Sequence, residues 1–481
     1  MIIVSITGPS MRDAAEQVRR SSLYADMFEF RLDCLHRPDL ALLLARTKKP
    51  RIVTCRPRWE GGEFSGSEEA RLELLLFAAF LGAEYIDYEL EADYRKHFLR
   101  RRTGTKLIVS KHLHSGPPAS PRALYRRMRA MGADVLKLAY AADDAADIGP
   151  MIEFLDLARR DRQRAIVTCM GEAGEASRIL YRKFGGWATY AAPEIGQPSA
   201  RGQVRGSELK RLYRADVLRR NSRVYGVIGN PVRQSKGVYV HNAIARSRNA
   251  VYCRFPVVNL DRFMKSVGGI LEGFSVTLPW KESIMKHLSS VDPIARRIGA
   301  VNTVVRRSGG LWGTNTDAPG ALDAIESVLR VAGKRVLVIG AGGAARAIVF
   351  EAQRRGAHVL IANRTGRKAR LLAAEYGCTS VPMKDLRRAT FDILVNATSV
   401  GMAPDTERSP VPAVILERGT VVFDAVYNPP MTRLLREARA RGARIIPGIE
   451  MYLNQAARQS RLFTGRRPNI GRMRVLLLKH L

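Results

Sequence analysis

The stretch DVLKLAY, residues 134–140, is the strongest clue to the fold and the chemistry of the first half of the chain. Its apolar side chains and its lack of turn residues predict a short buried strand. Lys137 stands in the middle of this strand, and a buried ammonium group is costly unless it is paired. Three explanations are open: the strand assignment is wrong, the lysine forms a structural ion pair, or it is a nucleophile that forms a Schiff base.

Seven more stretches of this kind occur in residues 1–215, separated by amphipathic helical segments. They are IIVSIT (2–7), MFEFRL (27–32), RIVTCR (51–56), EYIDYEL (84–90), KLIVSKH (106–112), RAIVTCM (164–170) and WATYAA (187–192). Eight strands alternating with helices predict a (β/α)8 barrel, whose chemistry takes place at the C-terminal ends of the strands. Polar residues gather at or after those ends, namely Glu29, Arg31, Arg56, His112 and Lys137, followed by Arg178 and Gln203 in later segments.

These residue types suit one kind of chemistry. A lysine imine draws electrons from the neighbouring carbon, so that a nearby histidine can remove a proton there. Arginines can hold a carboxylate through two hydrogen bonds at once. Together they favour the third explanation for Lys137, a nucleophile acting on a carboxylate-bearing carbonyl compound.

The motifs EFRLD (29–33), TCRPRWEGGE (54–63), SKH (110–112), DVLK (134–137) and SARGQ (199–203) resemble type I 3-dehydroquinate dehydratases over nearly all of residues 1–215. The resemblance implies that Lys137 forms an imine with the substrate's C3 carbonyl. It implies that His112 moves the proton from C2 and helps to expel the C1 hydroxyl, with Glu60 orienting His112. The substrate-binding residues that it implies are Glu29, Arg31, Arg56, Arg178, Ser199 and Gln203.

A second signal lies in KRVLVIGAGGAARAIVF, residues 334–350, which reads as a strand, a glycine-rich turn and a helix. Backbone N–H groups of such a turn and the helix N-terminus suit the pyrophosphate of a dinucleotide. The next strand ends in Asn363-Arg364-Thr365, with Arg367 beyond, and the acidic residue expected for NAD is absent. Arginines at this place suit the 2′-phosphate of NADP. The alternative for Arg364 and Arg367 is a solvated helix start.

The motifs GNPVRQSK (229–236), SVTLPWKE (275–282), GAVNT (299–303), NTDAPG (315–320), NATSVGM (396–402), DAVYNPP (424–430) and GIEMYLNQ (448–455) resemble shikimate dehydrogenases. The resemblance implies that Lys281 and Asp317 flank the reacting carbonyl. The substrate-binding residues that it implies are Ser235, Thr277, Asn302, Tyr427 and Gln455. The NADP-binding residues expected from the turn and from the resemblance are Gly340, Ala341, Gly342, Gly343, Ala344, Asn363, Arg364, Thr365, Arg367, Thr398, Gly448 and Met451.

One departure from the shikimate dehydrogenase pattern bears on specificity. Gly237 stands where that family usually has a second serine, so one hydroxyl donor near the substrate carboxylate is missing. The space left open makes tolerance of quinate an alternative for the second half. Ser275, where asparagine is usual, is a second departure.

The order of the two resemblances is similar to that of bifunctional dehydratase–shikimate dehydrogenases of aromatic amino-acid biosynthesis. We therefore expect an α/β protein with a barrel at 1–215, a substrate-binding lobe at 224–318 completed by 449–481, and a Rossmann NADP-binding domain at 319–448. A non-catalytic regulatory homologue is the alternative from another class. It predicts loss of catalytic residues such as Lys137 or Asp317, and both are present.

The composition limits the partners. The chain of 481 residues has 79 Lys and Arg against 45 Asp and Glu, a formal charge of +34. The basic residues are dispersed without aromatic residues between them, so small-molecule substrates are expected rather than nucleic acid. No membrane span, metal site or transit peptide is expected, and the five scattered cysteines suit a reducing compartment. We therefore expect a bacterial cytoplasmic enzyme.

Overall fold

The structure is a computed structural model that describes residues 1–92, 104–245 and 249–481. It divides into two compact units, one made of Met1–Arg233 with Arg246–Leu271 and the other of Gln234–Ala245 with Glu272–Leu481. The division does not coincide with the expected domain boundaries, which stay predictions.

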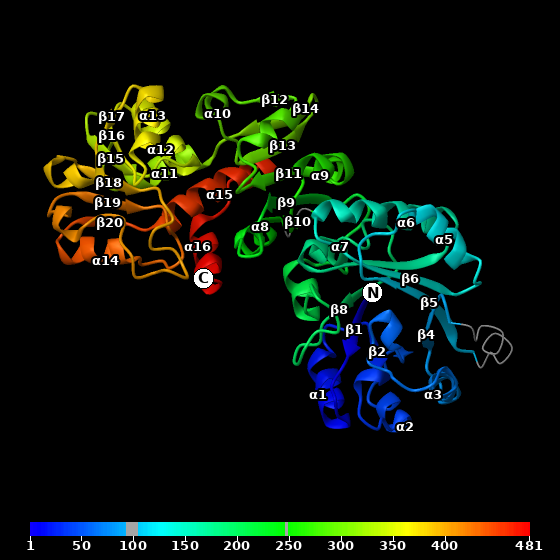
Figure 1. The fold of residues 1–481 in the computed structure, drawn as a ribbon. Helices are drawn as coiled ribbons and strands as arrows, with labels where there is room; N and C mark the ends of the chain where they lie inside the picture. The colour runs from blue at the N-terminus through cyan, green and yellow to red at the C-terminus, as the bar shows by residue number, and fades with distance from the viewer. Residues whose placement is uncertain (93–103, 246–248) are drawn as a thin grey trace. The chain divides into compact units, whose positions relative to one another are not determined.

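The first unit contains a sheet of eight parallel strands in the order β7-β6-β5-β4-β3-β2-β1-β8 (Figure 1). The strands are β1 (Ile2–Ile6), β2 (Met27–Arg31), β3 (Arg51–Thr54), β4 (Tyr85–Glu89), β5 (Lys106–Leu113), β6 (Val135–Ala141), β7 (Arg164–Met170) and β8 (Thr189–Ala191). The N–H of Trp187 donates to the carbonyl of Ala165, which joins the start of β8 to β7. All eight predicted strands are present, and the barrel prediction is confirmed.

The barrel is built on an apolar floor. Ile3, Ile52, Ile108, Val135 and Ile166 are fully buried and belong to one cluster that contains a residue from each of the eight strands. Because side chains alternate along a strand, every second residue points into the barrel. The same alternation brings polar side chains inward one step closer to the C-terminal ends.

Helices follow most of the strands. Those described are α1 (Met11–Ser21), α2 (Leu40–Leu44), α3 (Glu68–Phe80), α5 (Pro121–Arg129), α6 (Ile148–Arg160) and α7 (Glu175–Ile179). Ser10, Ser67 and Ser120 each accept a hydrogen bond from a backbone N–H in the first turn of the helix that follows. Such caps fix where a helix begins, because they satisfy N–H groups that have no partner inside the helix.

Three further elements belong to the first unit. Strand β9 (Arg223–Gly229) pairs in parallel with β10 (Ala250–Pro256), and helix α9 (Leu260–Ser266) follows. In the second unit, β11 (Leu271–Val276), which begins at the boundary, pairs antiparallel with β13 (Thr303–Arg307). The antiparallel partner of β13 on its other side is β14 (Gly310–Thr314), which also pairs in parallel with β12 (Ser290–Val291).

A six-stranded parallel sheet dominates the second unit, in the order β17-β16-β15-β18-β19-β20 (Figure 1). Its strands are β15 (Arg335–Ile339), β16 (His358–Ala362), β17 (Thr379–Ser380), β18 (Ile393–Asn396), β19 (Val421–Asp424) and β20 (Arg444–Ile446). Val336 and Val338 of β15 belong to one apolar cluster and Leu337 and Ile339 to another. A parallel sheet that is buried on both faces in this way is the doubly wound arrangement that was predicted.

The helices of the second unit are α8 (Gly237–Ala245), α10 (Pro293–Ile298), α11 (Asp317–Glu326), α12 (Gly343–Arg354), α13 (Gly366–Tyr376), α14 (Arg433–Ala440), α15 (Gly448–Thr464) and α16 (Ile470–Lys479). Helices α11 and α15 pack closely, since a Cβ at Gly320 would lie 3.0 Å from the Cβ of Gln455. Across the part of the chain that the structure describes, no helix is long and apolar enough to cross a membrane.

Candidate active sites

A layer of polar side chains lies above the apolar floor of the barrel. Ser5 is in register with Glu29, Thr54 with Asp87, and Ser110 with Lys137. All six residues are buried. Neighbouring strands thus bring their polar positions to one level, near the C-terminal ends where a barrel's chemistry occurs.

Lys137 is paired in this layer. Its Nζ donates to Asp87 Oδ2 at 2.7 Å and to Glu29 Oε1 at 3.1 Å, and it lies 4.3 Å from the centre of the Tyr190 ring. Burial alone would raise the pKa of the Asp87 carboxyl, but Arg56 and Lys137 outweigh it and hold the pKa well below its usual range. The strand assignment is therefore correct and the lysine has an ion pair, which leaves its role as a nucleophile open.

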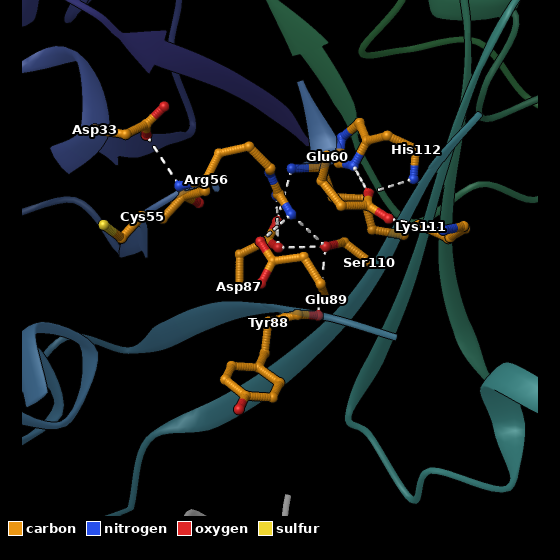
Figure 2. Close-up of polar contacts among 12 residues, drawn as sticks. Asp33, Cys55, Arg56, Glu60, Asp87, Tyr88, Glu89, Ser110, Lys111 and His112 are labelled. Carbon is orange, nitrogen blue, oxygen red and sulfur yellow. Dashed lines mark hydrogen bonds and ion pairs between the residues drawn. The ribbon is translucent and has the colours of Figure 1, made fainter. Parts of the chain in front are cut away.

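Arg56 crosses the layer to two carboxylates, as Figure 2 shows. Its guanidinium lies 2.7 Å from Asp87 Oδ1 and 2.5 Å from Glu89 Oε1, and it also donates to Ser110 Oγ at 2.8 Å. Arg31 is likewise engaged, through two hydrogen bonds to Asp33 of 2.9 and 2.6 Å. Both arginines were predicted to bind substrate; both line the cavity, but internal carboxylates already take much of their hydrogen-bonding capacity.

Arg178 differs from these two arginines. It is 1% exposed, and among the described residues no carboxylate pairs with it and its Nε has no hydrogen-bond partner. Burial lowers the pKa of its guanidinium to about 10. A buried cation without a counter-charge is costly, so this position is suited to an anionic ligand.

His112 and Glu60 form a hydrogen-bonded pair at the rim (Figure 2). The Nδ1 of His112 lies 2.9 Å from Glu60 Oε2, and the backbone N–H of His112 donates to the same oxygen at 2.7 Å. Lys111 Nζ donates to the other oxygen at 2.9 Å. Since a carboxylate only accepts, Nδ1 carries the proton and Nε2 carries the lone pair. Burial, followed by the charge of Arg56, lowers the pKa of His112 to about 4, so that its ring is a neutral base at pH 7.

A single cavity of about 420 Å³ collects all of the site residues predicted in the barrel. They are Glu29, Arg31, Arg56, Glu60, His112, Lys137, Arg178, Ser199 and Gln203. Gln203 Nε2 donates to Ser199 Oγ at 2.8 Å, and the N–H of Ser199 donates back to Gln203 Oε1 at 3.0 Å. These two hydrogen bonds therefore fix the conformation of the loop 199–203 at the cavity wall.

Several residues at this site were not predicted from the sequence. Asp87, Glu89 and Ser110 bind the side chain of Arg56, while Tyr190 and His114 line the cavity. Period-two alternation in YIDYE and KLIVS was a usable signal, because it places Asp87, Glu89 and Ser110 on strand faces opposite to those of Ile86, Tyr88 and Val109.

In the second unit, the predicted catalytic pair is formed. Lys281 Nζ lies 2.6 Å from Asp317 Oδ2, with 24% and 13% of the two side chains exposed. Asp317 begins α11, directly after Thr316, whose N–H donates to Asn302 Oδ1 at 2.8 Å. Asn302 was predicted to bind substrate, yet it also donates to Thr316 Oγ1 at 3.0 Å. Its amide therefore holds the turn that presents Asp317.

The other predicted substrate-binding residues lie on neighbouring elements of this unit. Thr277 follows β11, and the hydroxyl of Ser235 accepts from the N–H of Gly237 at 3.4 Å. The Tyr427 ring lies 5.0 Å from the ring of Tyr452, whose carbonyl accepts from Gln455 at 3.1 Å. That these four residues share a site with Lys281 and Asp317 stays a prediction. Ser275, the other departure, donates to Gln459 Oε1 at 2.8 Å.

The glycine-rich turn connects β15 to α12. Gly340 has φ of 124°, a conformation that favours glycine, and a Cβ there would lie 3.1 Å from the carbonyl oxygen of Ala397. At Gly342 and Gly343 a Cβ would meet no atom within 4 Å, which leaves open space at the start of α12. Ala341 and Ala344 complete the turn, and Thr398 follows β18.

The remaining predicted cofactor residues lie at the ends of β16 and β20. Asn363 Nδ2 donates to the carbonyl of Thr365 at 3.1 Å, and Arg364 and Arg367 are exposed beside it. Gly448 begins α15, where a Cβ would lie 2.4 Å from the carbonyl oxygen of Val426, and Met451 is in its first turn. An open turn with two exposed arginines fits a phosphorylated dinucleotide. Within the described residues, no group of three His, Cys, Asp or Glu side chains could hold a metal.

The fold and the two sites define a class: a barrel with an inward-facing lysine, joined to a dinucleotide-binding dehydrogenase. Comparison with protein families agrees. Residues 2–219 match type I 3-dehydroquinase, and 227–304 match the shikimate dehydrogenase substrate binding domain. Residues 323–421 match shikimate/quinate 5-dehydrogenase, and 448–478 match the shikimate 5′-dehydrogenase C-terminal domain.

Individual relatives give the particular family. The chain is 38% identical to a chloroplastic bifunctional 3-dehydroquinate dehydratase/shikimate dehydrogenase of Arabidopsis thaliana, over 96% of this chain and 82% of that protein. It is 40% identical to a shikimate dehydrogenase (NADP(+)) of Shouchella clausii, over 54% of this chain and 99% of that protein. The chain belongs to the bifunctional 3-dehydroquinate dehydratase/shikimate dehydrogenase family, as its motifs predicted.

Solved structures resemble the dehydrogenase part. Shikimate 5-dehydrogenase of Thermus thermophilus in complex with NADP(H) and shikimate is 38% identical, covers 54% of this chain and 100% of its own, and has a TM-score of 0.51. Quinate dehydrogenase of Corynebacterium glutamicum in complex with NAD is 30% identical. It covers 54% of this chain and 99% of its own, and it also has a TM-score of 0.51. The likeness thus extends to relatives with different substrates and cofactors.

The His112–Glu60 pair generates a testable prediction. We expect His112 to titrate with a pKa of about 4 in an NMR experiment. The hydrogen bond that His112 Nδ1 donates to Glu60 raises the pKa of His112 against the effect of burial, so Glu60→Gln should lower this pKa further. A titration of the wild-type ring near the ordinary value of 6.5, or an upward shift in the variant, would contradict this description of the site.

Proposed function

We propose that this chain catalyses two consecutive reactions of the shikimate pathway. The first unit dehydrates 3-dehydroquinate to 3-dehydroshikimate through a lysine imine, and the second part reduces 3-dehydroshikimate to shikimate with NADPH. The observation that carries the first reaction is the cavity in which Lys137, the His112–Glu60 pair and the unpaired Arg178 meet. The Lys281–Asp317 pair supports the second.

The dehydration begins at Lys137. After it loses one proton, Nζ attacks the C3 carbonyl carbon. The carbonyl oxygen takes up that proton and a second one from Nζ and leaves as water, which gives a cationic imine. Glu29 and Asp87, which pair with the ammonium in the free protein, stabilise the imine cation that replaces it. No new counter-charge has to be supplied, since the positive charge stays on the same nitrogen.

His112 then moves a single proton. Its Nε2 accepts the proton from C2, and the electron pair moves toward the imine nitrogen. Return of the electrons expels the C1 hydroxyl, which takes the proton from His112 and leaves as water. Hydrolysis of the imine frees Lys137. The neutral ring held by Glu60 suits the first step, and the Arg178 guanidinium holds the substrate carboxylate throughout.

In the second part, Lys281 and Asp317 act on the carbonyl that is reduced. When NADPH is bound, it supplies a hydride to the carbonyl carbon. Lys281 gives a proton to the oxygen in this proposal, which is supported by the ion pair that holds its ammonium group 2.6 Å from Asp317. Gly342 and Gly343 leave room for the pyrophosphate at α12, and Arg364 and Arg367 are suited to the 2′-phosphate.

The proposal includes small-molecule substrates only, with no nucleic acid, membrane or metal, and a cytoplasmic location. The five cysteines, all free, support a reducing compartment. The regulatory alternative has less support, because both catalytic pairs are intact. Quinate remains a second candidate substrate for the dehydrogenase, supported by Gly237 and by the likeness to quinate dehydrogenase.

Paired lysine variants test the two reactions separately. We expect the wild type to consume NADPH from 3-dehydroquinate, and NADH more slowly. Lys137→Ala should lose this activity by about 10³-fold or more but still reduce added 3-dehydroshikimate, because only the nucleophile is gone. Lys281→Ala should fail with both substrates. A wild type that consumes neither NADPH nor NADH would contradict the dehydrogenase assignment, and unchanged activity in Lys137→Ala would contradict the imine.

The quinate candidate is tested at Gly237, which begins α8. Gly237→Ser should raise the preference for shikimate over quinate by about fivefold, because it restores one hydroxyl hydrogen bond worth about 1 kcal/mol. Gly237→Ala is the matched control, since it fills the same space without a hydroxyl. Oxidation rates with the two substrates are compared in all three proteins. An unchanged ratio in Gly237→Ser would exclude a role for this position.

A further inference from the structure

Two parts of the dehydratase cavity wall lie next to residues that contact a segment outside the barrel. The wall includes Ala142 and Asp143, directly after the strand that carries Lys137, and Arg178 of α7. Their neighbours Asp144, Asp147 and Glu175 contact the segment 254–266, which runs from β10 into α9 in the same compact unit. This segment lies within the match to the substrate-binding domain of shikimate dehydrogenases, so it is not part of the dehydratase family's own sequence.

The first contact is made by two buried carboxylates after β6. Asp144 Oδ2 accepts from the N–H groups of Val258 and Asn259, at 3.2 and 2.7 Å, while Oδ1 accepts from Ala146 N–H at 2.9 Å. Oδ1 therefore binds the loop itself, and Oδ2 binds the backbone of a segment outside the barrel. The carboxylate ties the loop to the start of α9.

Asp147 repeats this arrangement. Its Oδ2 accepts from the N–H groups of Asp143 and Asp144, at 3.0 and 3.1 Å, and its Oδ1 pairs with Arg262 of α9. The packing is close as well, since a Cβ at Gly149 would lie 3.1 Å from the Cβ of Ser266. The backbone at Asp143, which lines the cavity, is thus fixed by a group that also binds α9.

The second contact holds α7. Glu175, its first residue, accepts from Tyr213 at 2.8 Å and from Arg254 of β10 at 3.3 Å. Arg254 also donates to the Tyr213 hydroxyl at 3.2 Å, and its side chain is only 12% exposed. Arg178 lies one turn further along α7. Arg254 and Tyr213 therefore hold the first residue of the helix that carries the buried Arg178.

We propose that Arg254 and Arg262 are positioning residues for the dehydratase reaction, contributed by the dehydrogenase part of the chain. The inference rests on the proposed dehydratase function. Arg254 acts through Glu175 on the placement of Arg178, and Arg262 acts through Asp147 on the backbone at Asp143. Arg254 has the larger effect, because the Arg262 side chain is 49% exposed and water weakens its ion pair.

The test uses the full chain with Arg254→Met, which removes the charge and keeps a stem of similar length. We expect the KM for 3-dehydroquinate to rise about three- to tenfold, because one charge-assisted hydrogen bond is lost and Arg178 is less well placed. The kcat should change by less than about twofold, since Lys137, His112 and Glu60 are untouched. Arg254→Lys should restore part of the affinity.

Two more proteins complete the experiment. Arg233→Met is the matched control. The ion pair of Arg233 with Glu172 is on the surface, with side chains 76% and 57% exposed, so the variant should have the KM of the wild type for 3-dehydroquinate. Glu175→Gln should raise the KM as Arg254→Met does, and the double variant should show less than the product of the two effects. Reduction of 3-dehydroshikimate by each variant reports on folding of the rest of the chain.

The outcomes separate the inference from the function on which it rests. A wild type that does not dehydrate 3-dehydroquinate would overturn the proposed function. An active wild type with an unchanged KM in Arg254→Met would overturn only the inference, as would independent effects of Arg254→Met and Glu175→Gln. A fall in kcat and in thermal stability with no change in KM would also overturn it, because that result indicates a merely structural role.

Discussion

The interaction on which the barrel site depends is the pairing of Lys137 with Asp87 and Glu29 in the interior. Burying charged side chains costs free energy, and here the cost is offset because every buried charge in this group has a partner of opposite sign. Lys137, Arg56 and Arg71 pair with the carboxylates of Glu29, Asp87 and Glu89. Three cations and three anions cancel, and hydrogen bonds from Ser5, Thr54 and Ser110 satisfy further oxygens. Removal of any one member leaves an uncompensated buried charge. The same carboxylates can stabilise the positive charge on Nζ of Lys137 both in the ammonium form and in the protonated imine.

The other features of the cavity follow from this arrangement. Because Arg56 and Arg31 already bind carboxylates, Arg178 is the buried guanidinium left for an anionic substrate within the described part of the cavity wall, while Arg201 lines the same cavity from an exposed position. The burial of His112 and the charge of Arg56 together keep the His112 ring neutral. Glu60 accepts from Nδ1 and so leaves Nε2 to take the proton from the substrate. Binding, covalent attachment and proton transfer are thus divided among residues from different strands and loops, as is usual in barrels of this kind.

The sequence predicted the fold and most of the residues that line the barrel cavity, and there is a physical reason for what it could not predict. The eight strands were visible from apolar runs, and Lys137 and His112 from their position in such runs. What the sequence could not show was pairing across strands: Arg31 and Arg56 look like free anion binders until Asp33, Asp87 and Glu89 are seen beside them. Asn302 likewise looks like a substrate ligand until Thr316 is seen to occupy its amide. The contacts from Glu175 and Asp147 to β10 and α9 join residues about 80 and 115 positions apart, which no local pattern reveals.

The proposed reaction depends on Nζ of the buried, ion-paired Lys137 becoming the nitrogen of an imine. Its most direct test is to add borohydride to the full-length protein during turnover of 3-dehydroquinate, and to map the reduced adduct by peptide mass spectrometry. We expect one adduct, on the peptide that contains Lys137, and rapid loss of dehydratase activity, while the reduction of 3-dehydroshikimate is preserved. An adduct on another lysine, or full dehydratase turnover without any adduct, would contradict it.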